Sequence, residues 1–254
     1  MWSVVIKSIL LPLIGTTAGS ACVFFLREKL NIKIQKALLG LASGVMVAAS
    51  VWSLIIPAVE RSSHLGSLSF VPALTGFGLG ILFMIFLDKV IPEPHTPEKG
   101  GNSASSMLFL AVTIHNLPEG MAVGAILASF LENDPHVTGA SAIALALGIA
   151  IQNFPEGSII SMPMAAEGKG KLKSFLWGAM SGIVEPLGAI VTMLLASSIT
   201  PMLPYVLAFA AGAMVFVTVN ELIPQMCEGK PFLMGTVMFA LGFGIMMALD
   251  VALG

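Results

Sequence analysis

Two similar hexapeptides, HNLPEG at residues 115–120 and QNFPEG at residues 152–157, interrupt long apolar stretches of this 254-residue chain. In each of them the first and fifth residues are four positions apart, and residues four apart share one face of a helix. Each segment therefore predicts a helix with one polar face. These faces comprise His115, Asn116 and Glu119 in the first segment, and Gln152, Asn153 and Glu156 in the second.

The hexapeptides also predict distorted helices that pack closely. Pro118 and Pro155 cannot donate the backbone hydrogen bond of a regular helix, so each helix is expected to kink and to expose a carbonyl group beside its polar face. Gly120 and Gly157 allow a neighbouring backbone to approach. We therefore expect the two polar faces to meet.

The composition of the chain predicts an all-α integral membrane protein. Hydrophobic residues make up 56% of the sequence and charged residues 10%, whereas a soluble domain has about 25% charged residues. Because a membrane-spanning helix needs about 20 mostly apolar residues, we expect eight spans. They cover residues 3–26, 36–58, 70–91, 105–129, 138–163, 173–197, 203–225 and 231–252.

The expected spans form one polytopic membrane domain, residues 1–254, and leave no room for a soluble catalytic domain. Most of the 12 lysine and arginine residues follow odd-numbered spans. Since positively charged loops face the cytoplasm, both termini are expected on the opposite, extracytoplasmic side. The cytoplasmic loop at residues 92–104 contains one histidine, His95, and is expected to be a flexible linker.

Similarity between the two ends of the chain predicts an inverted repeat. LASGVMVAASVWSLIIP at residues 41–57 resembles FAAGAMVFVTVNELIP at residues 209–224, and GILFMIFLD at residues 80–88 resembles GFGIMMALD at residues 242–250. Matched spans are an odd number of helices apart, so they cross the membrane in opposite directions, as in many secondary transporters. Chance similarity among small apolar residues is the alternative. The predicted 3+2+3 units are residues 1–91, 105–163 and 173–254.

Carboxylates inside a membrane need a compensating charge. A glutamate near the bilayer centre costs about 2.5 to 3.5 kcal/mol, and Glu119, Glu156 and Glu185 all lie within expected spans. A divalent cation would compensate them. Imidazole, carboxylate and amide ligands suit Zn²⁺ first, with Fe²⁺, Mn²⁺ and Cd²⁺ as alternatives, and without a cysteine ligand the ion can exchange. Because protons compete for the same groups, binding should weaken as the pH falls.

Each candidate ligand also has a simpler explanation. Histidines and amides in membrane helices commonly form interhelical hydrogen bonds, and Met46 in a run of small residues is typical of packing. Further candidates, for a metal pathway, are Ser53, Glu60, Asp88, Asn220 and Glu221. Of these, Asp88 also suits a boundary charge, and Glu221 can reach the membrane interface. Glu60 lies beside Arg61 at the outer edge, where an interfacial ion pair is the simplest expectation.

The span count, the inverted repeat and the paired hexapeptides resemble the ZIP (Zrt-/Irt-like protein) family of metal transporters, close to its compact prokaryotic GufA-type branch. SLIIPAVE at residues 53–60 and NELIP at residues 220–224 also resemble that branch. The resemblance covers all eight expected helices. It implies uptake of a divalent metal through a bacterial cytoplasmic membrane, alternating access by sliding of one helix bundle against another, no prosthetic group, and a homodimer.

Residue by residue, the resemblance implies two adjacent metal positions. The first position would use Met46, His115, Glu119, Gln152 and Glu156. The second would use Asn116, Asn153 and Glu185, with Glu119 and Glu156 bridging the two ions. Some family members carry an acidic residue where this chain has Asn153. The second position is therefore expected to bind its ion more weakly.

Two other classes of function give different expectations. An intramembrane metallopeptidase would need an HExxH motif, whereas His115 is followed by Asn116 and by a glutamate at position 119; we therefore expect no enzyme. A carrier or channel for another solute, with the carboxylates as a proton relay, is the main alternative. Divalent metal ions and lipid are the expected partners, and nucleic acid is not.

Overall fold

The computed structural model describes residues 1–25, 32–90, 104–135, 137–166, 168–198, 200–228 and 233–253, and within these ranges the secondary structure is helical, without β-strands. The α-helices are α1 (Trp2–Ser20), α2 (Cys22–Phe25), α3 (Ile32–Ala49), α4 (Ile56–Arg61), α5 (Phe70–Val90), α6 (Ala104–Leu131), α7 (Gly139–Ala166), α8 (Lys171–Ser181), α9 (Val184–Ser198), α10 (Leu203–Val217), α11 (Ile223–Cys227) and α12 (Leu233–Leu253). Short π and 3₁₀ segments are η1 (Ser50–Ile55), η2 (Ser63–Leu68), η3 (Thr200–Met202) and η4 (Thr218–Leu222). The predicted cytoplasmic loop, apart from its last residue, lies outside these ranges.

In the part of the chain that the structure describes, 7 helical segments are long and apolar enough to cross a membrane. They are Trp2–Phe25, Lys36–Arg61, Phe70–Val90, Gly139–Met162, Lys171–Leu195, Leu203–Cys227 and Leu233–Ala252. The all-helical membrane architecture is thereby confirmed. Helix α6, with 28 residues, occupies the place of the predicted fourth span, and several of its side chains lie outside the described set. The count of eight therefore stays a prediction.

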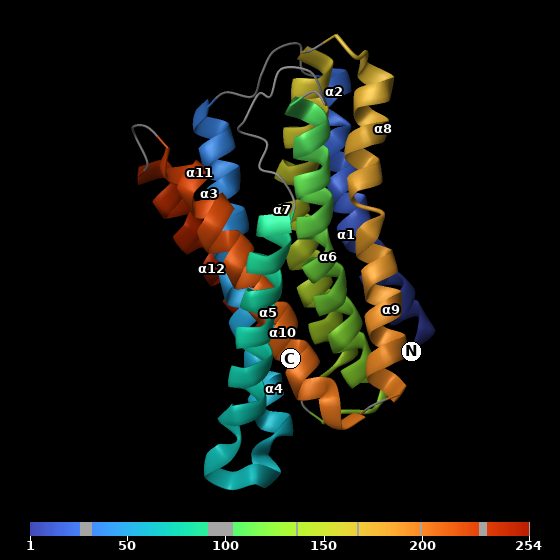
Figure 1. Cartoon of the computed structure of the whole chain (residues 1–254), viewed down its shortest axis with the longest axis vertical. Coiled ribbons are helices and arrows are strands. Elements are labelled where there is room, and N and C mark those ends of the chain that lie inside the picture. The colour runs from blue at the N-terminus through green and yellow to red at the C-terminus, as the bar shows by residue number, and fades with distance from the viewer. Residues whose placement is uncertain are drawn as a thin grey trace.

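The helices form two groups that lie side by side (Figure 1). The first bundle consists of α1, α2, α6, α7, α8 and α9, on the right of the figure. The second bundle consists of α3, α4, α5, α10, α11 and α12, on the left. Extensive packing pairs α1 with α7 and α6 with α9 in the first bundle, and α3 with α12 and α5 with α10 in the second. The bundles meet mainly where α3 packs on α7 and α10 packs on α6.

Glycine allows the paired helices to touch backbone to backbone. A Cβ atom at Gly242 of α12 would overlap the carbonyl oxygen of Leu41 in α3, and one at Gly80 of α5 would overlap that of Phe209 in α10. Small residues let membrane helices approach in this way, and the resulting van der Waals contact stabilises the pair. The apolar side chains on the outer surface, such as Val251 at 69% exposure, are consistent with contact with lipid.

Two prolines at matched positions of the predicted repeat follow π-helical turns. Pro57 comes after η1 and Pro224 comes after η4. A proline ring clashes with the carbonyl four residues earlier and donates no hydrogen bond, and a wider π turn relieves both problems. By contrast, α6 continues through Pro118 and α7 continues through Pro155.

Gly242 and its neighbour Gly244 give a matched test of this packing. Gly242→Ala should lower the thermal unfolding temperature of the purified protein, because the added methyl group overpacks the α3–α12 contact at a cost of about 1–3 kcal/mol. Gly244→Ala should have little effect or raise it slightly, because a Cβ there meets no atom within 4 Å. Equal unfolding temperatures for the two variants in the same detergent would contradict the backbone contact.

Candidate metal site

The two hexapeptides and the following helix bring six polar side chains into the interior of the first bundle. They are Asn116, Glu119, Gln152 and Asn153, each 0% exposed, with Glu185 at 1% and Glu156 at 6%. The first two lie in α6, the next two and Glu156 in α7, and Glu185 in the first turn of α9. The predicted meeting of the two polar faces therefore includes a third helix.

The three carboxylates of this cluster lie close enough to repel one another. Glu119 interacts electrostatically with Glu156 and Glu185, and Asn153 lies beside both Glu119 and Glu185. Among the described residues, the groups that act on Glu119 and Glu185 are carboxylates, amides and one hydroxyl, and they include no lysine or arginine. The described residues therefore supply hydrogen bonds to Glu119 and Glu185 but no lysine or arginine.

Gln152 links the two hexapeptides directly. Its Nε2 donates to Glu119 Oε1 across the α6–α7 contact and lies 3.3 Å from Asn153 Oδ1. Both protons of the amide nitrogen are thereby directed at oxygen atoms. The amide oxygen, Oε1, then points elsewhere and has no hydrogen-bond partner.

Asn116 holds a break in the helix that carries Glu185. Between α8 and α9 the backbone bonds shorten, with Glu185 N–H donating to Gly182 O at 3.1 Å, and Pro186 has no N–H to donate. The carbonyl oxygen of Ser181 accepts instead from Asn116 Nδ2 at 3.1 Å. The amide of Asn116 therefore fixes the break with its nitrogen and leaves Oδ1 without a hydrogen-bond partner.

Several oxygen atoms in the cluster are buried and accept no hydrogen bond from the residues that the structure describes. They are Asn116 Oδ1, Glu119 Oε2, Gln152 Oε1 and Glu185 Oε2. A buried polar atom without a partner costs roughly 1–3 kcal/mol, and more when it is charged. Acceptor oxygens of carboxylates and amides are groups that a cation can satisfy. Hard and borderline divalent ions bind oxygen ligands of this kind.

The donor set differs from that of a tight structural metal site. Among the described side chains, no group of three or more His, Cys, Asp and Glu residues is placed to hold a metal ion. His115 lies in α6, but its side chain is outside the described set. The described part of the cluster thus mixes carboxylates with amides, which favours an ion that can be released.

Met46 lies where the second bundle packs on α7. It is 1% exposed, and Thr218 of η4 directs its hydroxyl toward Met46 Sδ at 3.4 Å and Met214 O at 2.8 Å. The neighbouring Val45 is close to α7, because a Cβ at Gly148 would lie 3.2 Å from Val45 Cγ1. The Met46 sulfur therefore has a partner from another helix of its own bundle.

The predicted pathway residues lie outside the cluster. Ser53 donates to Asp250 Oδ1 at 2.7 Å, which joins η1 to α12. Asp88 and Asn220 are exposed, and Glu221 is half-buried. These positions are compatible with a route leading toward or away from the cluster, but the side chains do not form part of it.

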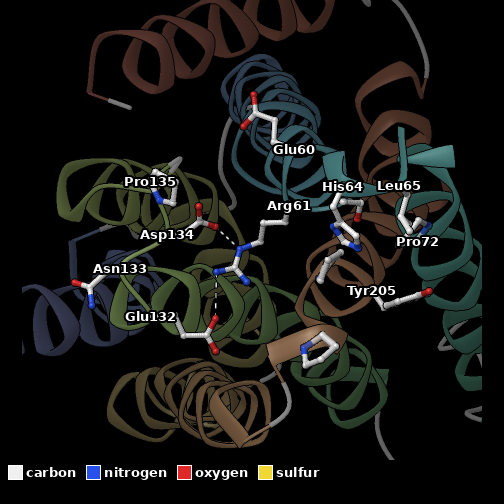
Figure 2. A pocket seen from close by; sticks show the side chains of 13 residues that line it. Glu60, Arg61, His64, Leu65, Pro72, Glu132, Asn133, Asp134, Pro135 and Tyr205 are labelled. Carbon is white, nitrogen blue, oxygen red and sulfur yellow. Dashed lines mark hydrogen bonds and ion pairs between the residues drawn. The ribbon is translucent and has the colours of Figure 1, made fainter. Parts of the chain in front are cut away.

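A cavity of about 920 Å³ lies at the end of the molecule where α4 ends and α6 connects to α7 (Figure 2). Arg61 crosses from the second bundle to that connection, where it donates to Glu132 at 3.2 Å and to Asp134. Figure 2 shows the carboxylate of Glu60 turned away from this guanidinium group. The sequence predicted an ion pair between Arg61 and Glu60, whereas the ion pairs of Arg61 that the structure shows are with Glu132 and Asp134.

Sequence reasoning missed the residues that position the cluster. The carbonyl of Ser181 and the hydroxyl of Thr16, which bonds to Glu185, come from segments with no polar motif. The stretch GTTAGS at residues 15–20 carried a signal, since small and hydroxyl residues favour close helix contact. Thr218 and the partners of Arg61 could be found only once the helices were placed.

Comparison with known proteins identifies related transporters. Residues 92–250 match the family model described as ZIP zinc transporter. The zinc transporter ZIPB of Bordetella bronchiseptica is 35% identical over 249 residues, which cover 94% of this chain and 78% of that protein. The zinc transporter GufA of Myxococcus xanthus is 33% identical, with 95% and 96% covered. The zinc transporter ZIP11 of Xenopus tropicalis is also 33% identical, with 100% and 99% covered.

Asn116→Asp should destabilise the protein more than Asn116→Ala. The aspartate would place a second acceptor against the carbonyl of Ser181, whereas alanine only removes the bond, so we expect the aspartate variant to lose about 1–2 kcal/mol more. Thermal unfolding of both metal-free variants in one detergent measures the difference. The same stability for both would mean that the Asn116 amide nitrogen does not hold the break.

Arg61→Gln should lower the unfolding temperature, because Glu132 and Asp134 would keep their charges without a cation between them. Breaking a partly buried pair in this way should cost about 1–3 kcal/mol. His64→Gln, at an exposed position lining the same cavity, serves as the control and should unfold at the wild-type temperature. An unchanged Arg61→Gln protein would show that the ion pair contributes nothing.

Proposed function

The chain belongs to the family of ZIP zinc transporters, and from this membership we propose that it carries Zn²⁺ into the cytoplasm through the cluster on α6, α7 and α9. Membership supports transport of a divalent metal ion across a membrane, and the chain is not an enzyme. The observation that carries the finer proposal is the group of buried oxygens without hydrogen donors. Such oxygens are suited to a cation that enters, loses water and leaves.

The bonds within the cluster support an assignment of ligands. In the first position, Gln152 can give an amide oxygen beside Glu119 and Glu156, with His115 and Met46 completing the set. In the second position, Asn116 Oδ1 and Glu185 Oε2 are available, whereas Asn153 Oδ1 already accepts from Gln152. The second lone pair of that oxygen remains available to an ion, but the ion competes with the bond from Gln152. This competition fits a weaker second position.

The helix pairings support the inverted 3+2+3 repeat with α6 as the fourth of eight spans. Exchanging spans 1 with 6, 2 with 7, 3 with 8 and 4 with 5 converts the α1–α7 pair into the α6–α9 pair. The same exchange converts α3–α12 into α5–α10. In this arrangement both termini lie on the extracytoplasmic side. We propose that the membrane is a bacterial cytoplasmic membrane.

The two bundles suggest how access alternates. The six side chains of the cluster belong to the first bundle and Met46 belongs to the second, so sliding of one bundle against the other would carry the ion past the α3–α7 and α6–α10 contacts and away from Met46. The Arg61 ion pair joins the bundles at the predicted outer end. It would break each time that end opens.

Uptake by purified protein in lipid vesicles tests the proposal. Glu119→Gln and Glu156→Gln, and the alanine variants at both positions, should reduce Zn²⁺ uptake about tenfold or more, because each removes a charged ligand from the cation. Glu228→Gln, which neutralises an exposed glutamate at the end of α11, should transport at the wild-type rate. Radioactive zinc measures the initial rates.

Two outcomes would overturn the proposal. Wild-type uptake by the Glu119 or Glu156 variants would show that the cluster does not carry the ion. Movement of another solute, with no metal bound at micromolar concentration, would favour a carrier in which the carboxylates relay protons.

A further inference from the structure

Thr16 lies at the point where three helices of the first bundle meet. It is 0% exposed. A Cβ at Gly157 of α7 would overlap the backbone oxygen of Thr16, and a Cβ at Gly182, in the α8–α9 break, would lie 2.9 Å from Thr16 Cβ. The absence of side chains at both glycines lets α7 and the break close on α1. Packing on two sides therefore fixes the place of the Thr16 hydroxyl group.

This hydroxyl group has two acceptors and one proton. Oγ1 lies 2.8 Å from Glu185 Oε1 and 3.3 Å from the carbonyl oxygen of Pro12. Hydrogen bonds to charged groups are shorter and stronger than neutral ones, so the proton is directed to Glu185. That bond occupies Oε1 and leaves Oε2 as the atom without a hydrogen-bond partner.

Glu185 needs such a restraint because of where it sits. It follows the helix break directly, and its backbone N–H bonds only three residues back, to Gly182. The contact between Asn116 and Ser181 holds the backbone of the break but does not touch the carboxylate. A partial rotation about the last side-chain bond of Glu185 would carry both oxygens out of these places, and it would break the bond to Thr16.

We propose that Thr16 is a positioning residue for the transported ion. It does not contact the metal; it holds Glu185 Oε1 so that Oε2 faces the cation. The inference rests on the proposed function, because it requires Glu185 to be a ligand. It adds α1, the one span of the first bundle to which no metal role has been assigned, to the groups that determine affinity.

Three variants of the full-length protein in lipid nanodiscs test the inference. Thr16→Val keeps the shape and loses the donor, and should weaken equilibrium binding of Zn²⁺ about tenfold. Thr16→Ser keeps the donor and should bind within about twofold of the wild type. Thr17→Val, the same change at the next position, should also leave binding unchanged. Thermal unfolding is recorded for each variant.

The visible absorption of bound Co²⁺ separates positioning from packing. At saturating Co²⁺, Thr16→Val should change the spectrum, because the ligand geometry differs, and Thr16→Ser should restore it. A lower unfolding temperature with unchanged affinity and spectrum would show a packing role only and overturn the inference. In a Glu185→Gln background, Thr16→Val should have no further effect on affinity, and an additive loss would also overturn it.

The Glu119→Gln variant, measured in the same way, keeps the two proposals distinguishable. Normal zinc binding and uptake by Glu119→Gln would remove the proposed function, and the inference with it. Loss of both by Glu119→Gln, together with wild-type affinity and spectrum in Thr16→Val, would remove the inference alone.

Discussion

Carboxylates that lie close together and are enclosed by protein are the constraint on which the rest of this structure depends. Glu119, Glu156 and Glu185 approach one another inside a helix bundle, and the groups described around Glu119 and Glu185 are neutral or acidic. Removing a carboxylate from water is costly, and a permanent arginine partner would offset that cost but close the site. Among the described groups around Glu119 and Glu185, no arginine or lysine offsets this cost. Incomplete compensation of this kind suits a transporter of cations, because the bound ion would supply the missing positive charge.

The surrounding packing makes such an arrangement tolerable. Helices α1 and α7, and likewise α6 and α9, touch along small residues, so their backbones are nearly in contact and their polar atoms are held at fixed separations. The two amides contribute to this arrangement because their nitrogens donate hydrogen bonds within the protein. Gln152 donates to Glu119 and Asn116 donates to the break before α9, which leaves the oxygens of both amides for a ligand. The orientation of the oxygens is thus a result of the fold.

Much of this could be predicted from the sequence, and the limits have physical causes. Spacing along a helix was enough to place Asn116 and Glu119 on one buried face and Gln152, Asn153 and Glu156 on another, and apolar length was enough to locate seven of the expected spans to within a few residues. Spacing could not reveal that α8 ends at Ser181, because a Gly-Ile-Val-Glu-Pro sequence is compatible with a kink as well as with a break. Nor could it pair Arg61 with Asp134 or Thr16 with Glu185, since those contacts join segments far apart in the chain. Residue spacing predicts which side chains share a helix face, but the packing of the helices determines which faces meet.

The tether between Asn116 and Ser181 has a thermodynamic consequence. The amide of Asn116 restrains the break between α8 and α9, and in the proposed site it also offers an oxygen to the cargo, so occupancy and the shape of that break would share a free energy of coupling. Coupling of this kind is reciprocal: if binding of the ion favours the rigid form of the break by some factor, the rigid form binds the ion more tightly by the same factor. If the proposed site is correct, lipid thickness, or a neighbouring protein that straightens α8 and α9, would change how tightly the metal ion is held without contacting any ligand.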